Sequence, residues 1–165
     1  MKFATLPNGT LDGRLVVVSK DLTKAVDATV IAPNLLSVVQ NWQEKAADLQ
    51  ALYDLLNAGK VEAAFDFEPS ACLAPLPRSS QWLDGSAFIN HGKLMEEAFN
   101  TKPIPDFDTI PVMYQGASDD FQGPTADILM PNEEDGIDFE GEFGVITGPV
   151  PMAATLDEAA QAICL

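Results

Sequence analysis

The sequence predicts an α+β protein, with a small N-terminal α/β domain over residues 1–74 and a second, β-rich domain over residues 75–165. Three observations favour this class. Two short apolar runs at the start indicate strands, and a long stretch with helical periodicity follows them. The remainder consists of short apolar segments separated by Pro, Gly and Asp, which is typical of strands joined by many turns.

The N-terminal domain is predicted from its first 59 residues. Residues 2–6 and 14–19 form two strands joined through PNGTLDG, where Asn8-Gly9 is a strong turn signal. Residues 34–57 form one amphipathic helix, and Gly59 lies where a helix C-cap favours glycine. The apolar stripe of this helix, which we expect in the core, is Leu35, Val38, Val39, Trp42, Ala46, Leu49, Leu52, Tyr53 and Leu56.

The boundary between the domains is predicted from prolines. Pro69, Pro75 and Pro77 stand close together, and proline removes backbone donors, so this stretch is irregular chain. A short helix is expected near residues 93–100, and short strands in TIPVMYQGASD and DILMP.

The charge balance excludes several kinds of partner. Twenty-five acidic residues against nine basic ones give a net charge of −16, which is unfavourable for nucleic acid and for anionic membranes. Two explanations stay open: an acidic, soluble surface, or carboxylates that gather around a cation. The first residues lack the pattern of a signal peptide and no apolar run is long enough to span a membrane. Two isolated cysteines, Cys72 and Cys164, indicate free thiols, so we expect a cytoplasmic protein without a signal peptide.

The stretch GIDFEGEFGVI, residues 136–146, alternates acidic and apolar side chains and predicts a β-strand. Glu140 and Glu142 would then lie on one face with Cα atoms about 6.6 Å apart, which lets both carboxylates approach one Mg²⁺ or Ca²⁺. Asp138 is interpreted as a flanking acid and not as a ligand. Taken alone, the pattern is a weak signal for a metal site, because such alternation is more often a solvated strand face.

A second element adds to this hypothesis. Asp84 precedes His91, the only histidine, by seven residues (91 − 84) in QWLDGSAFINHGK. A lone histidine is commonly a structural or an exposed residue. Together with an acidic strand, however, a carboxylate and an imidazole could form a metal site with a general base beside it.

Three stretches resemble the fumarylacetoacetate hydrolase family in order and spacing: PLPRSSQWLDGSAFINH, PVMYQGASDDFQGP and GIDFEGEFGVI. The N-terminal part is similar to the small domain of the bacterial members. This resemblance implies a catalytic domain of mixed β-roll type, a divalent Mg²⁺ (or Ca²⁺ or Mn²⁺) and a homodimer. It also implies a typical reaction, the cleavage of a carbon–carbon bond in a 1,3-dicarbonyl acid of the fumarylacetoacetate or acylpyruvate type.

The resemblance also assigns roles by position. Glu140 and Glu142 match the metal-binding ExE pair, and Asp84 matches the carboxylate that completes the metal shell ahead of the catalytic histidine. His91 matches that histidine, the general base that takes a proton from water. Tyr114 matches a tyrosine that contacts substrate, whereas Arg78 is a candidate for the substrate carboxylate only by proximity.

The likeness departs from the family at the end of the chain. TLDEAAQAICL begins as a helix with a Thr155/Glu158 capping box, and this helix is expected to run to the last residue. In the family it leads to another metal-ligating aspartate and to much of the β-roll. We therefore expect a C-terminally truncated or split member, which pairs with a missing C-terminal half or has doubtful activity by itself.

Two alternatives remain open beside a hydrolase. One is a hydratase, decarboxylase or isomerase of the same family acting on 2-keto acids, which shares the metal site and differs in the pocket. The other is a non-catalytic acidic module that binds a cation or pairs with another polypeptide.

Overall fold

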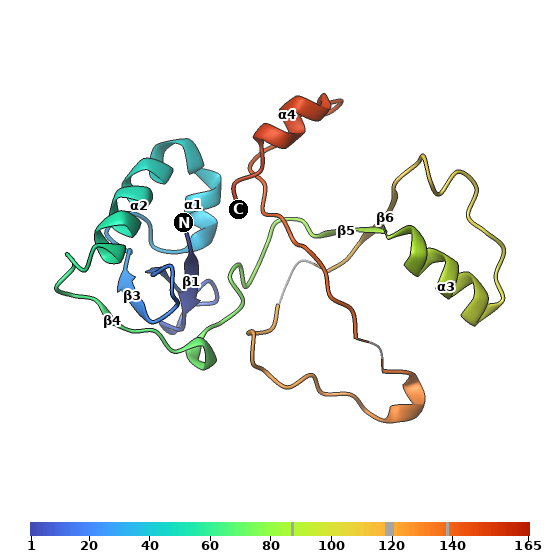
Figure 1. Cartoon of the computed structure of the whole chain (residues 1–165), viewed down its shortest axis with the longest axis horizontal. Helices are drawn as coiled ribbons and strands as arrows, with labels where there is room; N and C mark the ends of the chain where they lie inside the picture. Colours follow the sequence, from blue (N-terminus) through green and yellow to red (C-terminus); the bar gives the residue numbers. More distant parts are fainter. Residues whose placement is uncertain (87, 118–120, 138) are drawn as a thin grey trace. The chain divides into compact units, whose positions relative to one another are not determined.

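The computed structural model describes residues 1–86, 88–117, 121–137 and 139–165 (Figure 1). The chain divides into two compact units, one made of residues 1–78 and 120–165 and the other of residues 79–119. Antiparallel sheets and a few helices make up the described residues, so the predicted α+β class is confirmed at this level. No helix within the described ranges has both the length and the apolar character needed to cross a membrane.

The first unit contains a four-stranded antiparallel sheet in the order β1-β2-β3-β4. Its strands are β1 (Phe3–Leu6), β2 (Arg14–Val18), β3 (Lys24–Asp27) and β4 (Phe65–Asp66). The predicted pair of strands is confirmed, with Phe3 opposite Val17. The Asn8 side chain accepts a hydrogen bond from the Thr10 backbone N–H at 3.0 Å and so stabilises the predicted turn.

Strand β2 is the centre of this unit because both of its faces are buried. Leu15 and Val17 pack with helices α1 (Leu35–Gln40) and α2 (Trp42–Asn57), which cover one face of the sheet (Figure 1). Val16 and Val18 belong to a second apolar cluster, which Phe65, Phe67 and Cys72 complete. A strand buried on both faces explains the uninterrupted apolar run LVVV.

The single helix predicted over residues 34–57 is wrong in one respect, because Asn41 separates α1 from α2. Asn41 has φ −130° and ψ 36°, and its side-chain N–H₂ donates to the Ser37 carbonyl at 3.0 Å. Gly59 ends α2 as predicted. Its φ of +66° lets Lys60 N–H reach the Leu55 carbonyl at 3.0 Å, which closes the helix C-terminus.

The predicted apolar stripe contributes to the core on both sides of the break. Leu35, Val38, Val39, Leu49 and Leu56 are buried, and Trp42, Leu52 and Tyr53 pack against them.

The proline-rich segment after β4 is irregular, as predicted, apart from the short 3-10 helix η1 (Pro69–Ala71). It is nevertheless held against β1. The Leu73 N–H donates to the Thr5 carbonyl at 2.9 Å, and the Thr5 hydroxyl donates to the Pro75 carbonyl at 2.6 Å. Because Thr5 is fully buried, these two bonds attach the linker firmly to the sheet.

The end of the chain contributes to the core of the first unit. Helix α4 (Leu156–Gln161) begins with the predicted Thr155/Glu158 capping box. It stops at Gln161, earlier than expected, because Ile163 pairs with Thr147 in an antiparallel bridge. Ile146 N–H donates to the Leu165 carbonyl at 2.9 Å, and both side chains pack against the cluster around Leu15.

The strand predicted over residues 136–146 is wrong for the described residues 136, 137 and 139–146, which form no strand. Phe139 and Phe143 do not pack inward either, since they are 92% and 99% exposed, whereas Ile146 at the end of the stretch does pack against the core cluster. The physical reason is that a strand has no hydrogen bonds of its own and requires a neighbouring strand. Residues 128–130 also lie outside any strand, with Leu129 88% exposed, while a 3-10 helix, η2, covers Glu133–Asp135.

The second unit is a β-hairpin whose connection carries a helix. Strands β5 (Leu83–Ser86) and β6 (Val112–Gln115) pair antiparallel, and helix α3 (Ile89–Phe99) follows β5. The helix predicted near residues 93–100 is therefore confirmed but starts earlier, at Ile89. It ends where Asn100 takes a left-handed conformation with φ +50°.

Candidate functional site

Asp84 and Tyr114 are direct neighbours in the second unit. They are opposite each other in the register of β5 and β6, so their side chains leave the same face of the hairpin with Cβ atoms about 4.5–5.5 Å apart. Trp82 packs edge-on against the Tyr114 ring, with ring centroids 5.8 Å apart and an interplanar angle of 83°. Asp84 is half-buried, whereas Tyr114 is 61% exposed. A carboxylate and a phenol can thus both reach a small molecule on this face.

His91 lies in the same unit, in the first turn of α3, and its side chain is exposed. The next residue, Gly92, allows an aromatic ring to approach the helix closely. A Cβ atom at this position would lie only 2.8 Å from Cε1 and Cζ of Phe107. The contact with Phe107 therefore positions the turn of α3 that carries the imidazole.

Glu140 and Glu142 belong to the first unit and are both exposed. They follow η2 and precede Ile146, which is attached to the core through Leu165. Without a strand here, the alternation of faces does not establish that both carboxylates point the same way. Asp138, predicted to be a flanking acid, lies outside the described residues.

The proposed metal ligands form a chemically consistent donor set. Asp84, Glu140 and Glu142 offer only carboxylate oxygens, which suit Mg²⁺, Ca²⁺ or Mn²⁺ better than zinc. Across the described parts of the chain, no three His, Cys, Asp or Glu side chains gather in a way that could hold a metal ion. The structure thus brings together Asp84 and Tyr114, with His91 in the same unit, while Glu140 and Glu142 belong to the other unit.

Arg78, considered for the substrate carboxylate, has another partner. Its Nε donates to Asp12 Oδ1 at 3.0 Å and its Nη2 donates to Asp12 Oδ2 at 2.6 Å, which is a bidentate ion pair. This hydrogen bonding from Arg78 holds the pKa of Asp12 below its ordinary value of 3.8. The guanidinium thus fastens the linker to the loop between β1 and β2.

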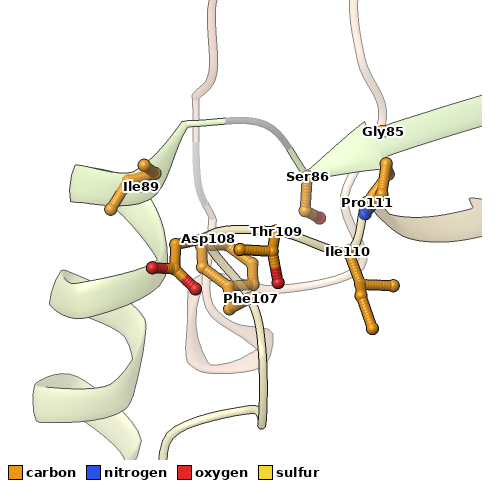
Figure 2. A pocket seen from close by; sticks show the side chains of 8 residues that line it. All are labelled: Gly85, Ser86, Ile89, Phe107, Asp108, Thr109, Ile110 and Pro111. Atoms are coloured by element: carbon orange, nitrogen blue, oxygen red, sulfur yellow. The ribbon is translucent and has the colours of Figure 1, made fainter.

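A cavity beside the hairpin was missed from the sequence. It has a volume of about 220 Å³ and is formed by the end of β5, the start of α3 and residues 107–111 (Figure 2). Its sequence signal is weak. The stretch PIPDFDTIP shows prolines on both sides of an aromatic residue, but nothing local indicates that Phe107 packs on Gly92.

Comparison with known families covers almost the whole chain. Residues 1–78 match the family model described as fumarylacetoacetase N-terminal domain 2, and residues 80–165 match the fumarylacetoacetate (FAA) hydrolase C-terminal domain. No curated protein matches the chain. The second match alone spans more than half of the 165 residues and includes Asp84, His91, Tyr114, Glu140 and Glu142. The chain belongs to the fumarylacetoacetate hydrolase family, a family of hydrolase- or lyase-type enzymes.

Proposed function

We propose that the chain is a divalent-metal-dependent hydrolase that cleaves a carbon–carbon bond in a 1,3-dicarbonyl acid of the fumarylacetoacetate or acylpyruvate type. The observation that supports this most is the match to the FAA hydrolase C-terminal domain, because it spans every proposed site residue. The pairing of Asp84 with Tyr114 on one face of the hairpin adds support. The proposal includes a mixed β-roll for the C-terminal domain.

In this proposal Asp84, Glu140 and Glu142 hold Mg²⁺, or Ca²⁺ or Mn²⁺ in its place. Their oxygen-only donor set supports this choice of ion. The ion would supply Lewis acidity at the two oxygens of the dicarbonyl group.

The protein's own groups then perform the proton transfers. The imidazole of His91 accepts a proton from water while the oxygen of that water adds to a substrate carbonyl carbon. The adjacent carbon–carbon bond breaks, and its electron pair leaves with the carbon between the carbonyls. That carbon takes up a proton, so that two acids are released. The Tyr114 hydroxyl donates a hydrogen bond to a substrate oxygen and fixes its orientation.

The proposal includes a homodimer. The exposed Phe139 and Phe143 side chains support self-association, since exposed aromatic surface favours contact with a partner. Light scattering measures this directly, and a monomeric mass at micromolar concentration would contradict it.

Turnover of an acylpyruvate tests the reaction. With Mg²⁺ present, we expect loss of enol absorbance and appearance of two acids. His91→Gln removes the base and lowers kcat by about 10²–10⁴-fold, the usual worth of general base catalysis. Replacing both Glu140 and Glu142 by Gln should abolish the turnover that depends on Mg²⁺. Glu134→Gln, at an exposed acid of η2, serves as the control and should retain this turnover.

The products distinguish this hydrolysis from the other reactions that the family could catalyse. A single hydrated adduct, or release of CO₂, would identify a hydratase or a decarboxylase in place of the hydrolase. Equal rates for the parent and His91→Gln would remove the imidazole from the mechanism.

A further inference from the structure

The cavity of the second unit has the size of a pocket for part of a small molecule. Cavities that enclose a whole drug-sized ligand measure about 300–1,000 Å³. The volume here is about 220 Å³, so it suits one end of a ligand whose remainder lies elsewhere. Its lining, shown in Figure 2, is Gly85, Ser86, Ile89, Phe107, Asp108, Thr109, Ile110 and Pro111.

The cavity continues the face of the hairpin that carries Asp84 and Tyr114. Ser86 lines it and stands two residues after Asp84 in β5, so the two side chains share a face with Cα atoms about 6.6 Å apart. Val112, the register partner of Ser86, stands two residues before Tyr114 on the opposite strand. A ligand held at Asp84 and Tyr114 therefore reaches the cavity by extending along this face.

The aromatic wall of the cavity is held in place by the helix. The Phe107 ring lies so close to the α3 backbone that a Cβ atom at Gly92 would be 2.8 Å from it. Phe107 is half-buried, and Ile89 lies one helical turn before Gly92 on the same side of α3. This wall is consequently formed before any ligand arrives, which lowers the entropic cost of binding.

The lining determines which end of a dicarbonyl acid enters. Four of its side chains are apolar, namely Ile89, Phe107, Ile110 and Pro111, and two hydroxyl groups add weak polarity. Among the described residues that line it, the one ionisable group is the Asp108 carboxylate and none is a lysine or an arginine. An acidic end would meet a like charge in this cavity, whereas an aliphatic chain would cover apolar surface.

We propose that this cavity, here named the tail pocket, binds the aliphatic acyl substituent of a 1,3-dicarbonyl acid and selects substrates by the length of that substituent. The inference rests on the proposed function for the identity of the ligand. Its geometry involves the second unit alone. Ile110 is a lining residue at which a larger side chain would reduce the space for the tail, and Asp108 excludes tails that end in a carboxylate.

The test is a series of straight-chain 2,4-dioxo acids with methyl, propyl and pentyl tails. Their dissociation constants are measured by NMR titration in Mg²⁺, and hydrolysis is followed separately in the same samples. We expect each added methylene to tighten binding by about fourfold until the tail pocket is full, which corresponds to about 0.8 kcal/mol per buried methylene.

Two variants with matched controls locate the effect. Ile110→Trp fills the tail pocket and removes the dependence on tail length, while binding of the methyl compound persists. Ile104→Trp keeps the dependence, because Ile104 has similar exposure, 50% against 58% for Ile110, but does not line the cavity. Asp108→Asn improves binding of a tail that ends in a carboxylate by about 2–5-fold, the range expected for one partly screened charge pair. Asp106→Asn serves as its control, since asparagine tolerates the φ of +59° found there.

Equal dissociation constants for all tails in the parent would overturn the tail pocket, as would an unchanged length dependence in Ile110→Trp. The proposed reaction fails in a different way. Length-dependent binding without any hydrolysis leaves the tail pocket intact and overturns the hydrolase. Hydrolysis with identical constants for every tail retains the hydrolase and overturns the tail pocket.

Discussion

The ion pair between Asp12 and Arg78 links two residues that are 66 positions apart in the chain, and the Asp12 side chain is only 18% exposed. Sequence reasoning could not identify this pairing, because nothing local at Arg78 reveals a partner so distant. The arginine was therefore considered for substrate binding, while the structure uses it to attach the linker. At the scale of residues, the feature hardest to predict from the sequence is which charged side chains form ion pairs with each other.

The energetic weight of this pair can be measured. Asp12→Asn should lower the free energy of unfolding by about 0.5–1 kcal/mol at neutral pH, since a partly exposed bidentate pair falls at the upper end of surface ion pairs. Urea unfolding followed by circular dichroism gives the value. Asp66→Asn, which breaks the more exposed pair with Lys24, should change stability less.

The same pair predicts a direction with pH. Because Arg78 lowers the pKa of folded Asp12, the pair's stabilisation is complete above the ordinary value of 3.8 and is lost as the pH falls through the lower folded value. Parent and Asp12→Asn should therefore converge in stability in strong acid. A difference that stays constant down to that range would contradict this account.

At the scale of elements, the hydrophobic patterns predicted the secondary structure correctly where a helix or strand is defined by burial against the core. The apolar stripe of α1 and α2 and the apolar run of β2 both pack in the core, and the sequence predicts helix and strand there. The alternation in residues 136–146 has the side-chain pattern of a strand, but it does not reveal whether a neighbouring strand is present to pair with it. The described part of this stretch forms no strand. The break at Asn41 was also missed, because an asparagine on an otherwise periodic stretch does not by itself end a helix.

Helix α3 offers a test of the contact between Gly92 and Phe107. Alanine is a better helix former than glycine by about 1 kcal/mol, yet Gly92→Ala places a methyl group 2.8 Å from the ring. We expect Gly92→Ala to displace Phe107 and to shift the imidazole NMR signal of His91, which is unambiguous because the chain has one histidine.

The double variant Gly92→Ala with Phe107→Leu should restore the His91 signal and gain helix stability. A double-mutant cycle with no coupling between the two positions would show that the close approach has no energetic consequence.

Helix α4 depends on its capping box. The Thr155 hydroxyl accepts from Glu158 N–H at 3.3 Å, and Glu158 Oε2 accepts from Thr155 N–H at 2.8 Å. Thr155→Ala should cost α4 about 1 kcal/mol, which is visible as loss of helical Cα chemical shifts over Leu156–Gln161. The backbone hydrogen bond from Thr155 lowers the pKa of Glu158, so acidification through that pKa should fray the parent helix as well. Thr101→Ala, outside any helix, should leave these shifts unchanged.

At the scale of the whole molecule, the net charge of −16 predicts how the protein responds to salt. Sodium chloride should raise the melting temperature modestly, because the Debye length falls to about 10 Å at 0.1 M and mutual repulsion weakens. Magnesium chloride at the same ionic strength should raise it further, since an ion that binds only the folded state adds stability by mass action. Calorimetry in matched salts distinguishes screening from a site, and identical melting temperatures would contradict a resident magnesium.

The pairing of Ile146 with Leu165 has a consequence for how this protein can be divided. The two family models divide the chain after residue 78. The apolar cluster around Leu15, however, also contains the side chains of Ile146 and Leu165, which lie beyond that point. The boundary between the two family domains therefore differs from the boundary of the packed core. A gene cut after residue 78 would encode an N-terminal piece that lacks part of its own core, and Ile146, which follows Glu140 and Glu142 in the chain, would lose its packing against that core.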